Sequence, residues 1–342
     1  MRKRIADHLP TAVLVVLLVV VVIAMSGLSR HFLAVSNLLS AIQLAAPLGI
    51  IAIGMTFVVL IGGIDLSVGS TFALSAIAIG MLCSAGVPLA LAAVLGLLVG
   101  VLCGLLNGVL VSALGLPSIV VTIATMAGYR GLALAISGGS SFPIPADLAF
   151  LGQGYVAGVP MPVIILVIVF AVAAVMLMTT PYGDRLYALG ANPVALRFAA
   201  QRSRRLTLSA YVVAGFLSAV AALVYGTMVS SAKSNFGTGY ELAAVTIVVV
   251  GGVALTGGRG SLWGALLATV VIALLQNGLS ISFVPTEIQT MFVGGALILT
   301  AVIYRWLPPL LVAGRRRDTV VDGGRTSSTA THPATPTKET TQ

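Results

Sequence analysis

The sequence predicts an all-α membrane protein, a polytopic bundle of about ten transmembrane helices in which some helices are broken or half-length. Hydrophobic residues make up 58% of the 342 residues, whereas charged residues make up only 8%. Soluble domains carry about 25% charged residues, so this chain cannot cover a water-facing surface of ordinary size. Its mean hydropathy of +1.11 and its long apolar runs indicate that most of its surface faces lipid.

Ten apolar runs are candidates to cross the membrane. The first covers about residues 9–25, and its basic start resembles a signal peptide, but Ser26–Arg30 is a poor cleavage site, so we expect an uncleaved span. A helix perpendicular to the membrane needs about 20 residues, so several runs are expected to be tilted or broken. The other nine runs are residues 40–61, 67–84, 88–112, 118–138, 161–180, 207–229, 241–256, 262–281 and 286–306.

The basic residues predict the orientation. If the N-terminus is cytoplasmic, ten spans return the C-terminus to the cytoplasm, and fifteen of the 18 lysines and arginines lie on that side. The exceptions are Arg30 and Lys233 outside and Arg130 within a span. The formal net charge of +9 is therefore a topology signal, and we expect no nucleic-acid partner.

The same pattern predicts the domain organisation. We expect a cytoplasmic N-terminus over residues 1–9, a transmembrane domain over residues 10–306 and a cytoplasmic tail over residues 307–342. The tail is rich in Thr, Ser, Pro and Gly, which is typical of disorder. Within the membrane domain, residues 181–206 form the long cytoplasmic loop, and the outer loop of residues 138–160 should pack as a lid or docking surface.

The stretch Gly62–Ser70 (Gly-Gly-Ile-Asp-Leu-Ser-Val-Gly-Ser) places one carboxylate between two spans, where a charge is costly. Gly62 and Gly63 let the backbone leave helical geometry. In one interpretation Asp65 or Ser67 caps the next helix. In the other, a broken helix exposes its backbone and the Asp65 carboxylate to a transport path. The residues alone leave both interpretations open.

This stretch resembles the hallmark of the ribose-type permease subunits of ABC importers, which belong to the ribose/branched-chain-amino-acid permease family. The resemblance extends over about residues 36–306. It also includes the segments Gly128–Gly131, Gly237–Leu242, Gly251-Gly252, Gly257–Gly260 and Gln276–Leu279. It implies that the translocation path involves Gly62, Gly63, Asp65, Leu66, Ser67, Gly69 and Arg130.

The 181–206 loop contains a short helix, for which Asn192 is the predicted cap and Pro193 the first helical residue. Ala195, Leu196, Phe198 and Ala199 should give it an apolar side. An interfacial helix whose arginines meet lipid phosphates is the alternative. The family's loop reads similarly (Gly-x-Asn-x-x-Ala-x-Arg) and couples the permease to its ATPase, which implies that role for Gly190, Asn192, Ala195 and Arg197. Ala200 and Gln201 depart from the family pattern, which usually has Gly and an aliphatic residue.

Arg130 lies near the middle of the 118–138 span, where contact with lipid would cost about 2.5–3.5 kcal/mol. It must therefore face the interior, and its partner can be Asp65, Glu241 or backbone carbonyls. Glu241 is expected at the outer end of its span, where it can simply mark the interface. Ala243 stands where the family commonly has an acidic residue, which argues against an acidic pair with Glu241.

Motifs for ATP binding and catalysis are missing from the sequence. None of the three lysines follows glycine, so there is no phosphate-binding Gly-x-x-x-x-Gly-Lys-Ser/Thr loop. The histidines lie near the chain ends or the first span, and no nucleophile–base pair is evident. We therefore expect a non-catalytic subunit without metal or cofactor, and ATP and Mg²⁺ in a partner ATPase.

These observations together predict a multi-pass transport subunit in a bacterial inner membrane. The resemblance implies a small polar solute and favours a monosaccharide such as ribose or another pentose or hexose. It also implies a partner ATPase, a solute-binding protein, and a second permease copy or a sister permease. The alternatives are an ion-coupled secondary carrier, for which only Asp65 is a candidate coupling carboxylate, and an ABC permease for branched-chain amino acids or another small polar solute.

Overall fold

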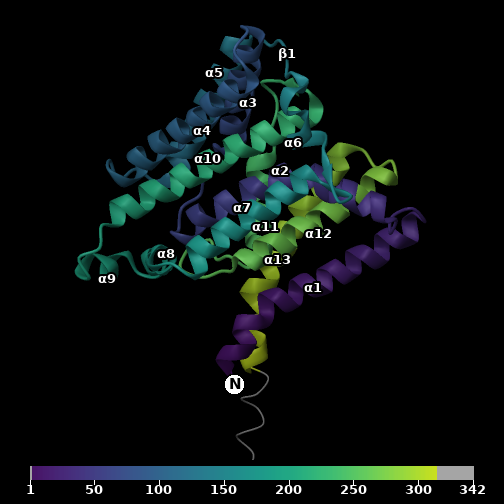
Figure 1. Cartoon of the computed structure of the whole chain (residues 1–342). Coiled ribbons are helices and arrows are strands. Elements are labelled where there is room, and N and C mark those ends of the chain that lie inside the picture. Colours follow the sequence, from purple (N-terminus) through teal and green to yellow (C-terminus); the bar gives the residue numbers. More distant parts are fainter. Residues whose placement is uncertain (1, 314–342) are drawn as a thin grey trace, which may run out of the picture. The chain divides into compact units, whose positions relative to one another are not determined.

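The computed structural model of the chain describes residues 2–313 (Figure 1). Residues up to Ala301 form one compact unit, and the second unit begins at Val302. The last helix continues to Ala313, so the start of the predicted 307–342 tail is helical. Residues 314–342 of that tail lie outside the described residues.

Ten helices coincide with the ten predicted spans, which confirms the polytopic helical bundle. Seven of the described helices are long and apolar enough to cross a membrane, and α3 and α11 are apolar but shorter. The ten helices are α1 (Arg2–Leu28), α2 (Val35–Leu60), α3 (Val68–Ser84), α4 (Leu89–Ser112), α5 (Ser118–Ser137), α7 (Met161–Met178), α10 (Ser203–Val229), α11 (Tyr240–Val250), α12 (Leu262–Ile281) and α13 (Thr286–Ala313).

The predicted span 241–256 is wrong at its second end, because α11 stops at Val250. Gly252, with φ of +84°, turns the chain out of the helix. The turns that follow reach back to α2, where the Gly258 N–H donates to the Leu60 carbonyl at 2.8 Å. Helix α11 is therefore a half-length helix continued by a loop.

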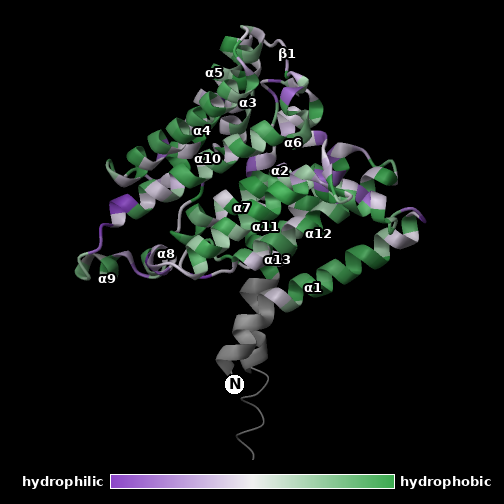
Figure 2. Cartoon of the chain, in the orientation of Figure 1, coloured by the Kyte–Doolittle hydropathy of each residue, from purple (hydrophilic) through white to green (hydrophobic). Residues whose placement is uncertain are grey.

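Helix α2 is the centre of the bundle. It packs against α7, α10, α11 and α12, and 83% of its most apolar window is buried, against 22% for α5. Figure 2 shows apolar residues along almost all of these helices, including their outward faces. Apolar side chains on outward faces are expected where helices meet lipid instead of water.

Glycines bring α4 and α10 close together. A Cβ atom at Gly100 would overlap the Gly215 carbonyl, and one at Gly104 would overlap the Tyr211 carbonyl. Small residues let membrane helices approach closely enough for backbone packing. Because α10 also packs against α2, the close α4–α10 pair holds α3, α4 and α5 against this central helix.

The connections gather at two opposite ends of the helices. At one end, β1 (Phe142–Pro143) pairs with β4 (Ser231–Ala232), and β2 (Tyr155–Val156) pairs with β3 (Val159–Pro160). The 138–160 loop also contains η1 (Ala146–Leu148) and α6 (Ala149–Gln153). Gln153 binds the Thr227 carbonyl at 3.1 Å, which fastens this loop to α10.

At the other end lie α8 (Pro181–Ala191) and α9 (Pro193–Phe198), with the connectors that follow α2, α4 and α11. The Gly258–Leu60 hydrogen bond joins two of these connections. Tyr187 on α8 joins a third, since its hydroxyl donates to the Gly260 carbonyl at 3.1 Å. The connections predicted to share the cytoplasmic side therefore meet in space.

Candidate translocation and coupling site

Asp65 is buried, with 2% of its surface exposed, in the connector of residues 61–67. Its Oδ1 accepts hydrogen bonds from the Ser67 backbone N–H at 2.9 Å and the Ser67 hydroxyl at 2.7 Å. The Asn107 amide in turn donates to the Ser67 hydroxyl at 2.7 Å. Ser67 itself is the N-cap residue of α3 and makes no side-chain cap bond. Asp65 thus organises the turn before α3 rather than capping the helix in the usual manner.

Side chains of α4 and α5 enclose this turn. The Tyr129 hydroxyl donates to the Cys103 carbonyl at 3.0 Å and lies 3.4 Å from Asn107 Oδ1. The Thr122 hydroxyl donates to the Ile64 carbonyl at 3.2 Å. Asn107 was not predicted from the sequence. It could have been found as a lone amide inside an apolar span, because a polar side chain there needs a specific partner.

Gly62 and Gly63 close helix α2. Their N–H groups donate to the carbonyls of Val59 and Val58, both at 2.9 Å, and Gly62 has φ of +79°. A Cβ at Gly63 would lie 2.8 Å from the Tyr211 hydroxyl. Leu66, next to Asp65, is half-buried against the hydrophobic core.

A second irregular segment, residues 230–239, runs back along α3 from its end toward its start. A Cβ at Gly80 would lie 2.9 Å from Ala232, and a Cβ at Gly237 would lie 2.7 Å from the Gly69 carbonyl. The 230–239 segment enters the bundle through a series of turns, in which the N–H groups of Phe236 and Tyr240 donate to the carbonyls of Lys233 and Gly237 at 3.2 and 3.1 Å. Helix α11 begins within the bundle, after these turns, which accounts for its short length.

Arg130 is half-buried and donates from one nitrogen to two carbonyls of this segment, Ser234 at 2.8 Å and Phe236 at 2.6 Å. The sequence left Asp65, Glu241 and backbone carbonyls as possible partners of Arg130, and its hydrogen bonds are to the carbonyls. Irregular backbone within a membrane must have its polar groups satisfied by protein or water. Arg130 meets that need for two carbonyls in the 230–239 segment.

Glu241 does not mark the outer interface, which corrects the expectation from the sequence. Its Oε1 accepts the Gly239 N–H at 3.1 Å. Its Oε2 is buried against the α carbon of Gly69, where a Cβ would overlap both this oxygen and the Gly237 carbonyl. Gly69 is thus required for the close approach of α3 to the start of α11.

Gly190 has a structural role at the end of α8. A Cβ there would overlap the Leu60 carbonyl and the Gly258 nitrogen, and a Cβ at Gly258 would overlap Ala191. The backbones of α8, α2 and the loop after α11 therefore touch directly. Burial raises the pKa of Tyr187, so its hydroxyl stays a donor to the Gly260 carbonyl in this cluster.

Asn192 caps α9, as predicted. Its Oδ1 accepts the N–H groups of Val194 at 3.1 Å and Ala195 at 3.0 Å. The predicted single apolar side is split, because Leu196 is buried whereas Val194 and Phe198 are exposed. Residues two apart lie on opposite faces of a helix, whereas residues four apart share a face.

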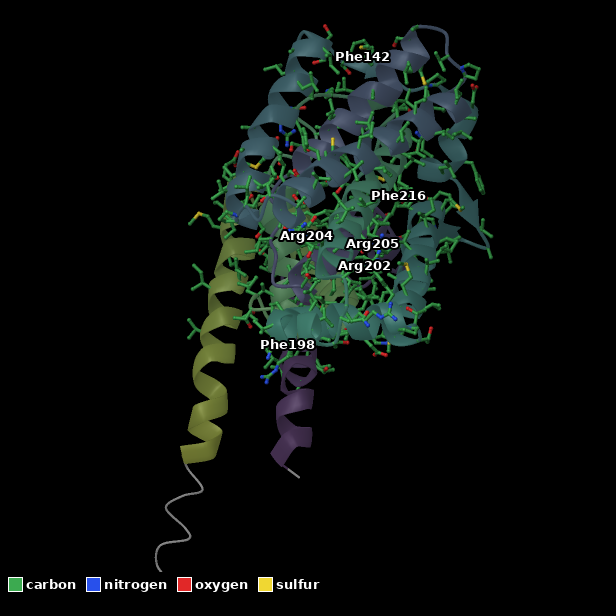
Figure 3. All side chains as sticks on the ribbon, turned by 90° about the vertical axis from the view of Figure 1, so that its left-hand side faces the viewer. Phe142, Phe198, Arg202, Arg204, Arg205 and Phe216 are labelled. Carbon is green, nitrogen blue, oxygen red and sulfur yellow. The ribbon has the colours of Figure 1, made fainter. Side chains whose placement is uncertain are left out.

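Phe198, with 89% of its surface exposed, is the most prominent apolar side chain of α9. Figure 3 shows it at the lower edge of the helical body, beneath Arg202, Arg204 and Arg205. Ala195 is also exposed. The side chain of Arg197 lies outside the described residues.

Ala200 ends the α9 turn with φ of +54°. This left-handed conformation favours glycine, which agrees with the glycine of the family pattern at this position. The departure noted from the sequence therefore falls at a strained residue, and the chain still closes the turn through a Gln201 N–H bond to the Leu196 carbonyl at 3.3 Å.

The predicted path residues thus divide into three groups. Gly62 and Gly63 form the end of α2, Asp65 and Ser67 belong to the buried network, and Gly69 meets the 230–239 segment held by Arg130. Of the predicted coupling residues, Gly190 touches the Leu60 carbonyl at the end of α2, and Asn192 caps α9.

Comparison with known proteins identifies the family of the chain. Residues 37–301 match the family described as branched-chain amino acid transport system / permease component. The ribose import permease protein RbsC of Bacillus subtilis (strain 168) is 39% identical over 289 residues, covering 84% of this chain and 89% of the relative. RbsC of Escherichia coli (strain K12) is 36% identical over 296 residues, covering 85% and 91%.

A further relative is the autoinducer 2 import system permease protein LsrD of Escherichia coli O9:H4 (strain HS), which is 34% identical over 299 residues, covering 84% of this chain and 90% of the relative. No solved structure matches the chain. The chain belongs to the branched-chain amino acid transport system / permease component family of multi-pass membrane permeases.

Proposed function

We propose that this chain is the translocation subunit of an ABC importer and passes a monosaccharide, such as ribose or another pentose or hexose, across a bacterial inner membrane. The ribose and autoinducer 2 import permeases that resemble it over most of its length support this solute class. The observation that carries the proposal is the direct backbone contact of α8 with the end of α2, beside the 61–67 connector.

The partners follow from the proposed role. A separate ATPase binds ATP and Mg²⁺ and docks on α9, a solute-binding protein docks near residues 138–160 and 230–240, and a second permease copy or a sister permease completes the path. This chain itself is not an enzyme and holds no cofactor. The N- and C-termini are cytoplasmic, since the positive-inside rule assigns that side to the end bearing α8 and α9.

Force applied to α9 has a short route to the transport path. Helix α9 follows α8 directly, and the backbone at Gly190 touches the Leu60 carbonyl without an intervening side chain. A displacement of α8 therefore moves the end of α2 and the Asp65 turn beyond it. Closely packed backbones transmit such a displacement because protein interiors have low compressibility.

Phe198→Asp combined with Val194→Asp tests the docking of the ATPase. We expect loss of ATPase co-purification and at least tenfold slower solute uptake, because the variant removes the exposed apolar face of α9. Phe283→Asp is the matched control, since Phe283 is 94% exposed and lies in the connection between α12 and α13, at the opposite end of the helices. Unchanged ATPase association in the α9 variant would refute the coupling role.

Reconstitution in liposomes tests the energy source and the solute. With ATPase and binding protein present, labelled ribose uptake should require ATP, and excess unlabelled leucine should leave it unchanged. Uptake by the chain alone under a proton or sodium gradient would instead identify an ion-coupled carrier. Competition by leucine would identify a branched-chain amino acid permease.

A further inference from the structure

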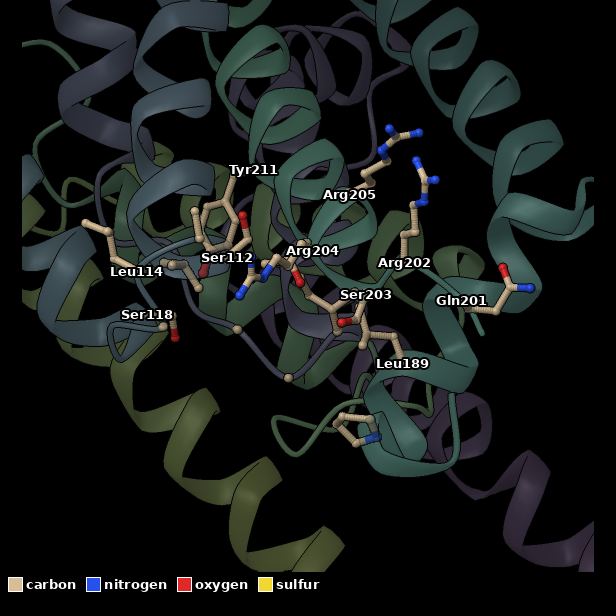
Figure 4. Close-up of a pocket in the computed structure, with 18 residues that line it drawn as sticks. Ser112, Leu114, Ser118, Leu189, Gln201, Arg202, Ser203, Arg204, Arg205 and Tyr211 are labelled. Atoms are coloured by element: carbon tan, nitrogen blue, oxygen red, sulfur yellow. The ribbon is translucent and has the colours of Figure 1, made fainter. Parts of the chain in front are cut away.

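A cavity of about 1060 Å³ opens between the end of α2, the turn between α4 and α5, and the start of α10 (Figure 4). Gly62 and Gly63 form part of its wall. Its volume is at the upper end of the range typical of small-molecule sites. Polar groups line it from the end of α2, the α4–α5 turn and the start of α10.

The start of α10 makes the cavity strongly positive. Arg202, Arg204 and Arg205 line it, and no Asp or Glu is among the residues of its wall. The first turn of α10 also contains no acidic residue. Because the N-terminal end of a helix carries a partial positive charge, three arginines there repel both the helix end and one another. An anion would compensate this charge.

The three arginines do not point the same way. In Figure 4 the Arg204 guanidinium extends toward the side of the cavity on which Ser112 and Tyr211 lie, whereas Arg202 and Arg205 extend away from it. Ser118 and Ser203 also line the cavity. One guanidinium and several hydroxyls therefore face a common space on the Arg204 side.

The Tyr211 hydroxyl is the second observation that indicates a ligand. Tyr211 is fully buried, it lines the cavity, and its hydroxyl has no hydrogen-bond partner among the described residues. The Ser118 side chain lies close enough to approach hydrogen bonding with it, but the two hydroxyls do not meet in hydrogen-bond geometry. A buried hydroxyl without a partner is costly, and a ligand oxygen in the cavity would satisfy it.

We propose that this cavity binds a phosphate group, held by Arg204, Tyr211 and the surrounding serine hydroxyls. A phosphate offers several acceptor oxygens in different directions, which matches a guanidinium and hydroxyls that approach from separate elements. A neutral solute would leave the arginine charge uncompensated. The phosphate group belongs either to a small soluble phosphate ester or to the headgroup of an anionic phospholipid. The proposal does not rest on the identity of the solute, and the wall of the cavity includes Leu189 of α8 and Pro193 of α9.

Binding to the purified full-length chain tests the proposal. In phosphatidylcholine nanodiscs at about 0.15 M NaCl, calorimetric titration with inorganic phosphate and with glycerol 3-phosphate reports a soluble ligand. Lipid exchange between nanodiscs containing phosphatidylglycerol and phosphatidylcholine, followed by native mass spectrometry of the retained lipid, reports a headgroup. Saturable binding in either arm supports the proposal and identifies the source.

Three variants locate the site. We expect Arg204→Gln to weaken binding about 10- to 100-fold, because it removes a charge-assisted contact. Tyr211→Phe, which keeps the ring, should weaken binding about two- to tenfold. Arg202→Gln is the matched control, because it makes the same charge change two residues away. It should weaken binding about twofold or less.

Two results would overturn the proposal. One is no saturable binding in either arm while the protein remains folded by circular dichroism. The other is equal weakening by Arg204→Gln and Arg202→Gln, which would indicate a diffuse positive surface. If neither the titrations nor the lipid exchange shows binding and Arg204→Gln lowers only ATPase association, Arg204 contacts the partner protein and the phosphate site is refuted.

Discussion

Two connectors enter the bundle beside α3, and the chain stabilises them in different ways. Residues 61–67 approach the start of α3 from the α8–α9 end and are held by the buried network of Asp65, Ser67 and Asn107. Residues 230–239 approach from the opposite end and are held by Arg130, which is half-buried. The two meet where Gly69 touches Gly237 and Glu241.

The difference indicates which connector is rigid and which can rearrange. In the first, the side chains of Asp65, Ser67 and Asn107 are all buried, and hydrogen bonds of 2.7 to 2.9 Å join the connector to α4. In the second, a flexible arginine binds backbone carbonyls, and a carboxylate oxygen of Glu241 has no hydrogen-bond partner among the described residues. We therefore expect substitutions in the first connector to affect stability and transport together, and those in the second to affect transport more.

The largest effect is expected for Asp65→Ala. It removes the acceptor of both Ser67 groups and leaves buried donors unsatisfied, at a cost of about 2–4 kcal/mol of unfolding free energy. Thermal unfolding of the detergent-purified chain and solute uptake should both fall. Asp65→Asn keeps an oxygen that can accept these bonds, so its stability should stay near that of the wild type while transport is impaired. Normal uptake by Asp65→Asn would show that the carboxylate charge has no transport role.

Arg130→Met should have the next largest effect. The change preserves much of the apolar stem but leaves the Ser234 and Phe236 carbonyls without their donor, at a cost of about 1–3 kcal/mol. Uptake should fall more than tenfold, whereas Arg130→Lys should recover part of it because the shorter ammonium group can still donate to a carbonyl. If Met and Lys variants transport equally well, the carbonyl contacts do not hold the 230–239 segment in place.

Gly69→Ala tests the meeting point of the two connectors. Its Cβ would overlap the Glu241 carboxylate and the Gly237 carbonyl, so we expect a loss of about 1–3 kcal/mol in stability from overpacking. Gly128→Ala is the matched control, since a Cβ there meets nothing within 4 Å. Equal melting temperatures for the two variants would contradict the close approach of α3 and α11.

Glu241→Gln should have the smallest effect on stability, below about 1 kcal/mol. The variant keeps the Oε1 acceptor for Gly239 and removes only the charge beside Gly69. Uptake measured with and without this substitution tests whether the charge matters to the transport cycle. A large loss of thermal stability would show that the Glu241 carboxylate anchors the second connector as firmly as Asp65 anchors the first.

The sequence predicted the helices better than their ends and their contacts. The ten spans, the Asn192 cap and the Pro193 start were read from local patterns, because hydrophobic length and capping depend on neighbouring residues. The end of α11 at Val250, the burial of Leu196 opposite Phe198, and the position of Glu241 were not predictable in this way. Each depends on a segment distant in the sequence: the α2 end, the helical body and Gly69.

The sequence by itself determined the class of the protein, its family and the separation of its connections into two ends. Composition and span length decide the class and the two ends, since lipid tolerates only helices with few charges and satisfied backbones, whereas the resemblance of the Gly62–Ser70 stretch indicates the family. Only the tertiary structure decided the partner of Arg130, the network around Asp65 and the contact of Gly190 with α2. Hydrogen bonds and glycine contacts act over about 3 Å, and no local pattern specifies which distant backbone comes that close.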